Sequence, residues 1–338
     1  MTIRAFCKIL FLSSLTLSTA ACANTPTKHE ADYKAFAAEM EKKHQIPATE
    51  VEELLAGTEF RDDIIAAITR PAEGKPWFEY RPIFLQPDRI QGGVKFWQEN
   101  AELLDRISRE YGVPPEIIVA IIGVETRYGQ HTGRYRVLDA LATLAFGYPK
   151  RADFFRAELE QFLVLSREES VDPRAALGSY AGAMGKPQFI SSSYRRYAVD
   201  GDGDGRRDLW QSNADVIASV ANYFKLHGWQ AGELITLPTE YDGIKYLQPF
   251  VDAGMKPSIP LSDLQTNGVK PAGNTALASD TLCSLIQLDM GAQYEYWLGL
   301  QNFYVITRYN HSNLYAMAAY QLSQEILAAK QAAEAVSR

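Results

Sequence analysis

Residues 113–129 read VPPEIIVAIIGVETRYG, a run of apolar side chains that ends in a carboxylate. Pro115 suits the first position of a helix, because the N–H that proline lacks would have no partner there. The isoleucines and valines of 117–124 leave almost no polar face, so we expect a helix that is buried on nearly all sides. Gly129 is its expected stop, and such a helix belongs at the centre of a helical domain.

Glu125 directly follows the last valine of this run. Apolar surroundings disfavour the ionised carboxylate, and the negative end of the helix dipole disfavours it as well. Both effects raise the pKa of the carboxyl, which is what a general acid near neutral pH requires. An ion pair with Arg127, or with another Arg at the helix end, is an equal alternative on spacing alone.

The segments before this helix are mainly amphipathic. Helices are expected over 30–43, 48–55 and 62–68, where apolar residues recur at helical spacing. The aromatic stretch WFEYRPIF (77–84) is expected to be extended, and residues 92–111 to form one further helix. From Pro115 to about Phe224 the pattern stays helical, apart from one loop rich in Gly and Asp at 178–208.

After Trp229 the sequence pattern changes to short apolar runs separated by Pro, Gly and Thr. The runs ELITLP, GIKYL, LCSLIQL, YEYWLGL and FYVIT are typical of short strands. From Asn310 a helical stripe returns, built from Leu314, Met317, Ala318, Leu322 and Ile326. The expected fold class is therefore mainly α (α+β), with a small β-rich insertion late in the chain.

We expect five segments along the chain. They are a leader (1–23), the N-terminal helical part of a flanking domain (24–78), a catalytic core with the Asp-rich loop (79–232), a small β-rich domain (233–308) and a C-terminal helix returning to the flanking domain (309–338).

The first segment has the pattern of a secretory signal. Arg4 and Lys8 precede a short apolar run and then small residues, which is too short for a good membrane span. Two processing routes compete: cleavage after Ala23, or lipidation of Cys22 within an imperfect lipobox that has Thr19 where Leu is usual. The chain is thus expected to be exported to the periplasm, where lipidation would anchor it to the outer membrane. Cys283 would be the one cysteine of the folded part, which excludes an internal disulfide.

Composition limits the function classes. The chain has 338 residues, 46% of them hydrophobic and 22% charged, which is normal for a folded globular protein. The net charge is −7, so the chain lacks the overall positive charge that favours binding of nucleic acid, and no nucleic-acid partner is expected. These values also exclude a disordered or polytopic membrane chain.

A second carboxylate pattern stands at residues 200–210, DGDGDGRRDLW. Asp200, Asp202, Asp204 and Asp208 occupy positions 1, 3, 5 and 9 of a calcium-binding loop, with Gly205 at position 6. Alternating carboxylates favour a hard cation that binds oxygen. The sequence therefore predicts a structural calcium site, and no organic cofactor is expected.

The same loop departs from the pattern at position 12, which is Gln211 rather than Glu. The backbone carbonyl of Arg206 would be the ligand at position 7, and Asp215 on the next helix is the expected displaced ligand. A solvated acidic turn is the alternative interpretation.

Several longer motifs appear in one order along the chain. They are GVETRYG, VLDALATLAF, YPKRADFF, SYAGAMGKPQF, YAVDGDGDG and SVANYFKLHGW within about 77–230, and NFYVITRYNHSNLYAMAAYQL at 302–322. Together they closely resemble the membrane-bound lytic murein transglycosylase B family (glycoside hydrolase family 103). The resemblance implies a lysozyme-like helical core. It also implies cleavage of the β-1,4 bond between N-acetylmuramic acid and N-acetylglucosamine in peptidoglycan, leaving 1,6-anhydromuramic acid ends.

The resemblance also implies residue roles. Glu125 would be the sole catalytic acid and base, with the substrate's N-acetyl oxygen stabilising the cationic intermediate. Ser179 and Gln188 would hold the N-acetyl group and the acid, and Arg151 would meet a peptide or lactyl carboxylate. The implied cleft-lining residues are Tyr80, Met184, Phe189, Tyr223, Tyr309, Asn310 and Tyr315.

Several of these residues could instead have a purely structural role. Tyr223 could be a core residue, Ser179 a helix cap and Arg151 a surface charge. Lys186-Pro187 replaces a pair that is usually small or aromatic and contains Gly in the family, which puts the loop shape before Gln188 in doubt.

Two other functions remain open at this point. A lysozyme-like hydrolase would need a second carboxylate or a held water opposite Glu125, and Asp139, Asp153 and Asp172 are candidates by position. A calcium-stabilised cell-wall binding protein would need neither. In each case the expected partner is the peptidoglycan glycan strand, and the chain is expected to act as a monomer.

Overall fold

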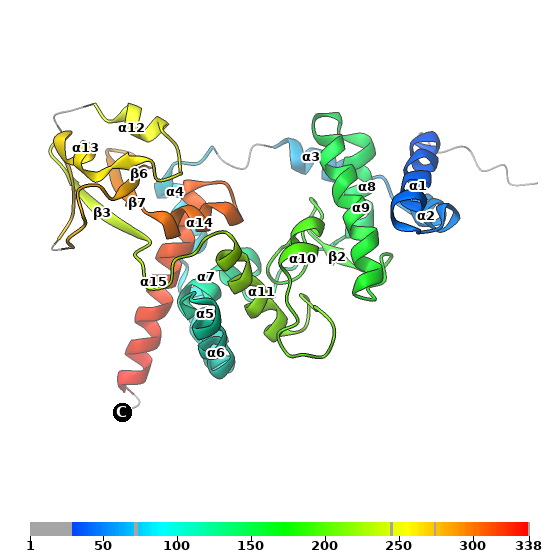
Figure 1. The fold of residues 1–338 in the computed structure, drawn as a ribbon, viewed down its shortest axis with the longest axis horizontal. Helices are drawn as coiled ribbons and strands as arrows, with labels where there is room; N and C mark the ends of the chain where they lie inside the picture. The colour runs from blue at the N-terminus through cyan, green and yellow to red at the C-terminus, as the bar shows by residue number, and fades with distance from the viewer. Residues whose placement is uncertain (1–28, 71–73, 244–245, 274, 337–338) are drawn as a thin grey trace, which may run out of the picture.

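The computed structural model describes residues 29–70, 74–243, 246–273 and 275–336. The expected leader, Cys22 and the link to residue 28 lie outside the described residues. The molecule is elongated, with a mainly helical body and a lobe of strands at one end (Figure 1). The mainly α (α+β) class expected from the sequence is confirmed.

Helices make up the first part of the body. Their bounds are α1 (Glu30–His44), α2 (Ala48–Ala56), α3 (Asp62–Thr69), α4 (Trp77–Phe84), α5 (Pro87–Glu99), α6 (Ala101–Tyr111) and α7 (Pro115–Thr126). The three earliest agree with the sequence-based expectation to within one residue at each end.

The remaining helices are interleaved with short strands. The helices are α8 (Val137–Gly147), α9 (Ala152–Glu168), α10 (Ser191–Tyr197), α11 (Asn213–Leu226), α12 (Gln248–Asp252), α13 (Leu261–Thr266), α14 (Gln301–Tyr309) and α15 (Asn313–Val336). A 3-10 turn, η1, occupies Pro149–Arg151.

Strands form two antiparallel sheets. Their bounds are β1 (Tyr135–Arg136), β2 (Leu177–Gly178), β3 (Thr236–Tyr241), β4 (Ile259–Pro260), β5 (Val269–Pro271), β6 (Leu282–Asp289) and β7 (Tyr294–Gly299). β1 pairs with β2, and the other strands form a five-stranded sheet in the order β4-β6-β7-β3-β5. This sheet packs its own small apolar core, which includes Leu264, Cys283 and Leu298.

Several expectations about local structure differ from the structure, and among the described residues of GIKYL no strand forms. WFEYRPIF is helix α4 rather than an extended segment, and FYVIT lies in helix α14 rather than in a strand. In both cases burial of one face, led by Trp77 and Phe303, outweighs the β preference of the aromatic and branched residues. The single helix expected over 92–111 is two helices, because the chain breaks at Asn100.

The C-terminal helix packs differently from the expected return to the N-terminal helices. α15 packs along α4, α5 and α7. α1 and α2 lie towards the opposite end, where ion pairs such as Arg156–Glu39 and Arg167–Glu50 join them to α9 (Figure 1). The apolar surface of α7 explains the position of α15, since α7 needs cover on all sides.

α7 is the buried centre of the body, as its apolar run predicts. Its residues from Ile117 to Val124 are all buried. Its end is held by Tyr128, whose hydroxyl donates to the Arg89 carbonyl at 2.8 Å. A Cβ at position 123 would lie 2.5 Å from that hydroxyl oxygen, so Gly123 is needed for the close approach. The helix ends at Thr126, before the expected stop at Gly129, because Arg127 and Tyr128 adopt left-handed backbone conformations.

Candidate active site

Glu125 lies on the last turn of α7, and part of its surface remains accessible. The dense surroundings of the carboxyl raise the pKa of Glu125 from its usual 4.5 to about 7. The hydroxyl of Tyr315 donates to Oε1 of Glu125 at 2.5 Å, and this bond acts in the opposite direction by favouring the carboxylate. Glu125 is therefore poised between its acid and its base form near neutral pH.

The alternative, an ion pair between Glu125 and an arginine at this helix end, does not form among the described residues. The guanidinium of Arg127 points to Asp88, at 3.8 Å. Within the described part of the chain, burial and Tyr315 are the two influences on the pKa of Glu125, and no charged neighbour contributes. The carboxyl thus has the environment of a general acid rather than that of a salt-bridge partner.

Buried tyrosines surround the carboxyl. Tyr315 from α15 and Tyr309 from α14 both feel the charge of Glu125, which together with burial raises the pKa of each phenol well above 10. Tyr309 donates to the carbonyl of Pro187 at 2.7 Å. This bond fixes the loop that carries Gln188 against α14.

An aromatic cluster continues from Tyr309. Its ring centre lies 4.8 Å from that of Tyr223 and 5.8 Å from that of Phe189. Tyr223 also donates to the carbonyl of Arg308 and stacks on His227, with ring centres 4.0 Å apart. Tyr223, Phe189 and Met184 are all buried, so each has a packing role whether or not it also meets a ligand.

The loop after β2 is shaped by its own polar groups. The Ser179 hydroxyl oxygen accepts the N–H groups of Ala181 and Ala183, at 3.2 and 3.0 Å. Met184 and Phe189 exchange two backbone hydrogen bonds of 2.8 and 3.1 Å across the tip of the loop. Because Ser179 accepts both bonds, the hydroxyl hydrogen remains available to donate.

Gln188 occupies a strained position at the tip of the same loop. Its φ of 53° lies in the left-handed region, which non-glycine residues adopt rarely. Its side-chain Nε2 donates to the carbonyls of Thr132 and Gly185, at 3.1 and 2.9 Å. With both donor hydrogens used, Oε1 is the atom that Gln188 can offer to a ligand, as an acceptor.

The remaining predicted substrate-binding residues are Tyr80, Asn310 and Arg151. Tyr80 on α4 lies against Phe84 with tilted rings, at 5.1 Å between ring centres, and is close enough to raise the pKa of Tyr315. Asn310 is exposed directly after α14. Arg151 is also exposed, and its guanidinium carbon lies 4.1 Å from the ring centre of Phe154.

The carboxylates considered for a hydrolase have other partners. Asp139 is buried and accepts the guanidinium of Arg136 at 2.6 and 2.9 Å. Asp172 accepts the backbone N–H of Arg174 in a surface turn, and Asp153 is exposed on α9. None of the three is among the groups that perturb the pKa of Glu125.

Two residues to which the sequence assigned no role connect this site to its surroundings. Thr126 donates to the Lys186 carbonyl at 2.8 Å. The Lys186 ammonium in turn donates to the Gln211 carbonyl and to Asn213 Oδ1, at 3.1 and 2.5 Å. The departure of Lys186 from the family pattern was the one signal that could have marked this residue.

The Asp-rich loop brings three of its predicted ligands together. One oxygen from each of Asp200, Asp202 and Asp204 lies within 4.8 Å of the others. Asp200 accepts the N–H groups of Gly203 and Gly205, at 2.6 and 2.8 Å, which lowers the pKa of its carboxyl. The loop closes on itself around carboxylates, as an oxygen-rich cation site requires.

Asp215 and Asp208 are placed differently from those three. The buried Asp215 accepts the N–H groups of Gly201 and Asp208, at 2.8 and 2.6 Å, and so ties both ends of the loop to α11. Asp208 turns to the following backbone, where it accepts the N–H groups of Trp210 and Gln211. The structure thus groups Asp215 and Asp208 as braces of the loop.

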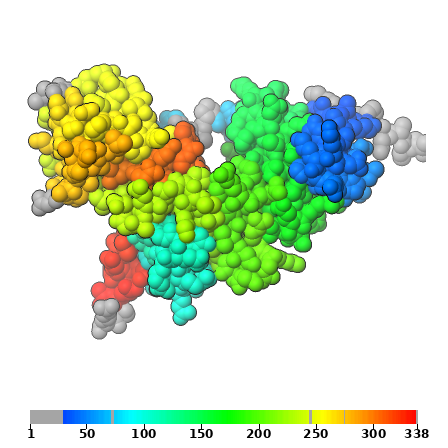
Figure 2. Space-filling view, in the orientation of Figure 1, coloured from blue at the N-terminus to red at the C-terminus, as the bar shows by residue number. Residues whose placement is uncertain are grey.

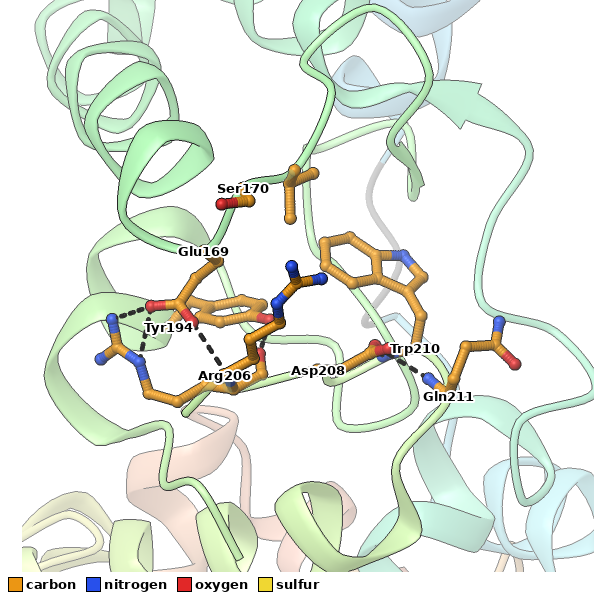
Figure 3. Close-up of a pocket in the computed structure, with 9 residues that line it drawn as sticks. Glu169, Ser170, Tyr194, Arg206, Asp208, Trp210 and Gln211 are labelled. Atoms are coloured by element: carbon orange, nitrogen blue, oxygen red, sulfur yellow. Dashed lines mark hydrogen bonds and ion pairs between the residues drawn. The ribbon is translucent and has the colours of Figure 1, made fainter. Parts of the chain in front are cut away.

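A pocket of about 250 Å³ lies beside this loop (Figure 3). Glu169, Arg206 and Trp210 are among its lining residues, and Glu169 is held there by Arg207. Glu125 does not line it. The pocket therefore belongs to the surroundings of the Asp-rich loop and not to the carboxyl of α7.

Among the described residues, every helix is too short or too polar to cross a bilayer.

Comparison with known proteins gives a consistent result. Residues 28–324 match the family described as Transglycosylase SLT domain. Membrane-bound lytic murein transglycosylase B of Escherichia coli (strain K12) is 43% identical over 318 residues, which is 91% of this chain and 84% of that protein.

Solved structures agree with the sequence match. Soluble lytic transglycosylase SltB1 of Pseudomonas aeruginosa superposes with a TM-score of 0.84 at 48% identity, covering 89% of this chain and 99% of that one. The Escherichia coli lytic transglycosylase SLT35, solved in complex with calcium, gives 0.81 at 44% identity, covering 88% and 93%. The predicted lysozyme-like core is thereby confirmed.

Proposed function

The chain belongs to the family of transglycosylases with an SLT domain, and from that premise we propose that Glu125 is its single catalytic acid and base. The protein is a lytic transglycosylase that acts on peptidoglycan. One observation supports the assignment of Glu125. Burial raises the pKa of its carboxyl to about 7, and the carboxyl accepts a hydrogen bond from Tyr315.

The hydrogen bond from Tyr315 decides which oxygen of Glu125 carries the proton. Oε1 accepts the phenol hydrogen, so the acidic proton resides on Oε2. In the first step Oε2 protonates the glycosidic oxygen, and the bond from that oxygen to C1 of the muramic residue breaks. Tyr315 then stabilises the resulting carboxylate until it takes a proton from the C6 hydroxyl, whose oxygen attacks C1.

Between these steps C1 is electron-deficient. The substrate's own N-acetyl oxygen is the nucleophile nearest to it, and such substrate assistance replaces a second carboxylate in some glycosidases. Gln188 supports this role, because its free Oε1 is an acceptor that matches the acetamido N–H. Ser179 retains a hydroxyl hydrogen that can be donated to the acid or to the acetamido group.

The aromatic residues around Glu125 would shape the cleft. Tyr80, Tyr309 and Tyr315 would contact the sugars. Met184, Phe189 and Tyr223 would support the wall from behind, because Phe189 and Tyr223 pack against Tyr309 and Met184 pairs with Phe189 through the backbone. Asn310 and Arg151 are exposed and would meet the outer parts of the substrate, Arg151 through a carboxylate.

The test is mass spectrometry of soluble products after purified peptidoglycan is incubated with the wild type and with Glu125→Gln. Anhydro-muropeptides from the wild type alone are the expected result. Glu116→Gln is the matched control, since Glu116 lies at the other end of α7, is also partly buried and has a raised pKa. Reducing ends would support a hydrolase, and anhydro products from Glu125→Gln would remove Glu125 from the mechanism.

We also propose that the Asp-rich loop holds calcium. The oxygens of Asp200, Asp202 and Asp204 converge, and Gly203 and Gly205 adopt the positive φ values, 79° and 90°, that let the loop wrap around an ion. The donor set is oxygen throughout, which suits a hard cation. The Arg206 carbonyl would be a further ligand, whereas Asp215, whose oxygens accept from Gly201 and Asp208, lies outside the converging group and would brace the loop.

For location, we propose export by the segment 1–23 to the periplasm, with the mature protein held at the outer membrane when Cys22 is lipidated. The membrane-bound name of the Escherichia coli relative supports an anchored form. The mass of the N-terminal peptide of the mature protein distinguishes lipidation of Cys22 from cleavage after Ala23. The domain limits 79–232 and 233–308, and a monomeric state, are part of the same proposal.

A further inference from the structure

The five-stranded sheet contains a point where two neighbouring strands separate. β3 pairs with β7 from Thr236 to Pro238 and then turns to pair with β5 from Thr239 to Tyr241. Pro238 has no N–H to continue the ladder, and its carbonyl accepts from Ala272 on the β5 side. Residues 294–296 of β7 are therefore left without a strand on that side.

This separation opens a hollow of about 470 Å³ lined by aromatic rings. Tyr241, Tyr294, Tyr296 and Trp297 line it, and Tyr294 is 55% exposed. The Thr239 hydroxyl donates to the Tyr296 carbonyl at 2.7 Å and closes the floor where the strands part. The hollow is thus formed by the arrangement of the strands themselves.

A second hollow of about 460 Å³ adjoins the first through two shared residues, Glu295 and Trp297. It lies between β7 and the helices α4 and α15, with Trp77 and Tyr320 among its aromatic lining. Neighbouring side chains of β7 point to opposite faces of the sheet, so the two hollows flank the same segment of β7 and meet at Glu295 and Trp297. We call the two hollows together the aromatic groove. It belongs to the lobe of strands that stands out at one end of the molecule (Figure 2).

The chemistry of the lining favours a neutral, hydroxyl-rich ligand. Arg81 is the one cation among the residues that line the groove, and its Nε already donates to Gln321 at 2.7 Å. The carboxylates Glu295 and Glu325 repel anions but accept hydrogen bonds from hydroxyls. Flat aromatic faces beside amide and carboxylate groups suit the C–H faces and hydroxyls of sugars.

The groove has a fixed position relative to Glu125. α15 carries Tyr315, which binds Glu125, and Tyr320, which lines the groove. Five residues along a helix correspond to about 7.5 Å of rise and about 140° of rotation, so the two tyrosines point in different directions. α4 likewise carries Tyr80 near the carboxyl and Trp77 at the groove.

We infer that the aromatic groove is a second binding site for the sugar backbone of the glycan strand, separate from the cleft at Glu125. This inference rests on the proposed function, because the strand held at the groove is the strand cut at Glu125. The acidic rim selects sugars over the acidic stem peptides. The groove therefore holds long strands and leaves the cleavage of short ones unchanged.

The test separates binding from turnover by using the mature chain with Glu125→Gln. Its co-sedimentation is measured with insoluble, crosslinked peptidoglycan, and soluble glycan strands that an amidase has freed of stem peptides serve as the competitor. Adding Tyr294→Ala or Trp297→Ala is expected to weaken retention about tenfold, as loss of a central aromatic contact does. Tyr246→Ala is the matched control, because Tyr246 is 77% exposed in the same lobe and does not line the groove.

A second measurement keeps the result interpretable. With Glu125 intact, the same variants are assayed on a soluble tetrasaccharide, and an unchanged kcat/KM is expected together with an unchanged melting temperature. Retention within about twofold of the parent overturns the inference and leaves the groove to an extended segment of a partner protein. A fall in tetrasaccharide cleavage without loss of fold also overturns it, by making the groove part of the cleft. Cleavage by Glu125→Gln itself would instead refute the proposed function.

Discussion

The carboxyl of Glu125 and the carboxyls of residues 200–204 are the same chemical group in opposite surroundings. Glu125 has apolar helix neighbours and one hydrogen bond, and burial raises its pKa to about 7. Asp200 accepts backbone N–H groups from its own loop, which lower its pKa. The first site stores a proton near neutral pH, whereas the second stays ionised, as the proposed calcium site requires.

This difference shows that backbone placement, and not side-chain identity, assigns the two roles. A helix satisfies its own N–H groups, so at its C-terminal end Glu125 finds none to accept. The left-handed glycines of the loop turn several N–H groups towards Asp200.

Removing calcium should have the largest effect on stability. An ion present at about 1,000 times its Kd stabilises the native state by about 4 kcal/mol, and chelation removes this contribution. The melting temperature measured with and without EGTA should therefore differ clearly for the wild type. For Asp202→Asn the two values should nearly coincide, because one of the three converging carboxylates is lost.

Asp263→Asn serves as the control for that experiment, since Asp263 lies on α13 in the lobe of strands. A wild-type melting curve that EGTA leaves unchanged, in protein shown to be free of metal, would reject the calcium site.

Glu125→Gln should stabilise the protein in a manner that depends on pH. A carboxyl whose folded pKa is raised costs stability as pH rises from about 4.5, where the unfolded chain ionises, to about 7, where the folded chain follows. The neutral Gln avoids this cost and can still accept from Tyr315. We expect roughly 2 kcal/mol of added stability at pH 8 and no difference at pH 4.

Urea unfolding at the two pH values measures this difference. Equal stability of the wild type and Glu125→Gln at pH 8 would mean that the carboxyl is well solvated, and the raised pKa would lose its basis.

The sequence predicted the surroundings of both groups of carboxylates, because these depend on local pattern. The apolar run before Glu125 predicts its burial, and the alternating Asp residues predict their convergence. The sequence did not predict that Asp215 braces the loop through backbone N–H groups, since this depends on how α11 approaches. It also misassigned residues 77–84, whose helix is stabilised by contacts with α15, a segment distant in sequence.

Tyr315→Phe should reduce activity by a smaller amount and move its pH dependence. Loss of a hydrogen bond to a carboxylate costs about 1.5 kcal/mol, which is about tenfold in kcat/KM. Because Tyr315 lowers the pKa of Glu125, its removal should shift the alkaline limb of the pH–rate profile to higher pH. Tyr320→Phe, on the same helix, is the control. An alkaline limb that stays in place would show that another group sets it.

Lys186→Met should have the smallest effect, because it breaks the link between the two carboxylate sites without altering either. Its ammonium bonds to Gln211 and Asn213 are lost, while the backbone bonds to Leu209 and Thr126 persist. We expect a destabilisation of about 1 kcal/mol.

The distinguishing readout for Lys186 is kinetic. The loop bearing Gln188 would be less well held, so kcat should fall a few-fold, about 1 kcal/mol or less in barrier height, with little change in KM. Lys186→Arg keeps a donor and should restore most of the rate, which a purely structural loss of packing would not predict. Equal responses of Lys186→Met and the wild type to EGTA, in both rate and melting temperature, would contradict this expectation. In that case the Asp-rich loop and Glu125 act independently, and the link through Lys186 has no functional role.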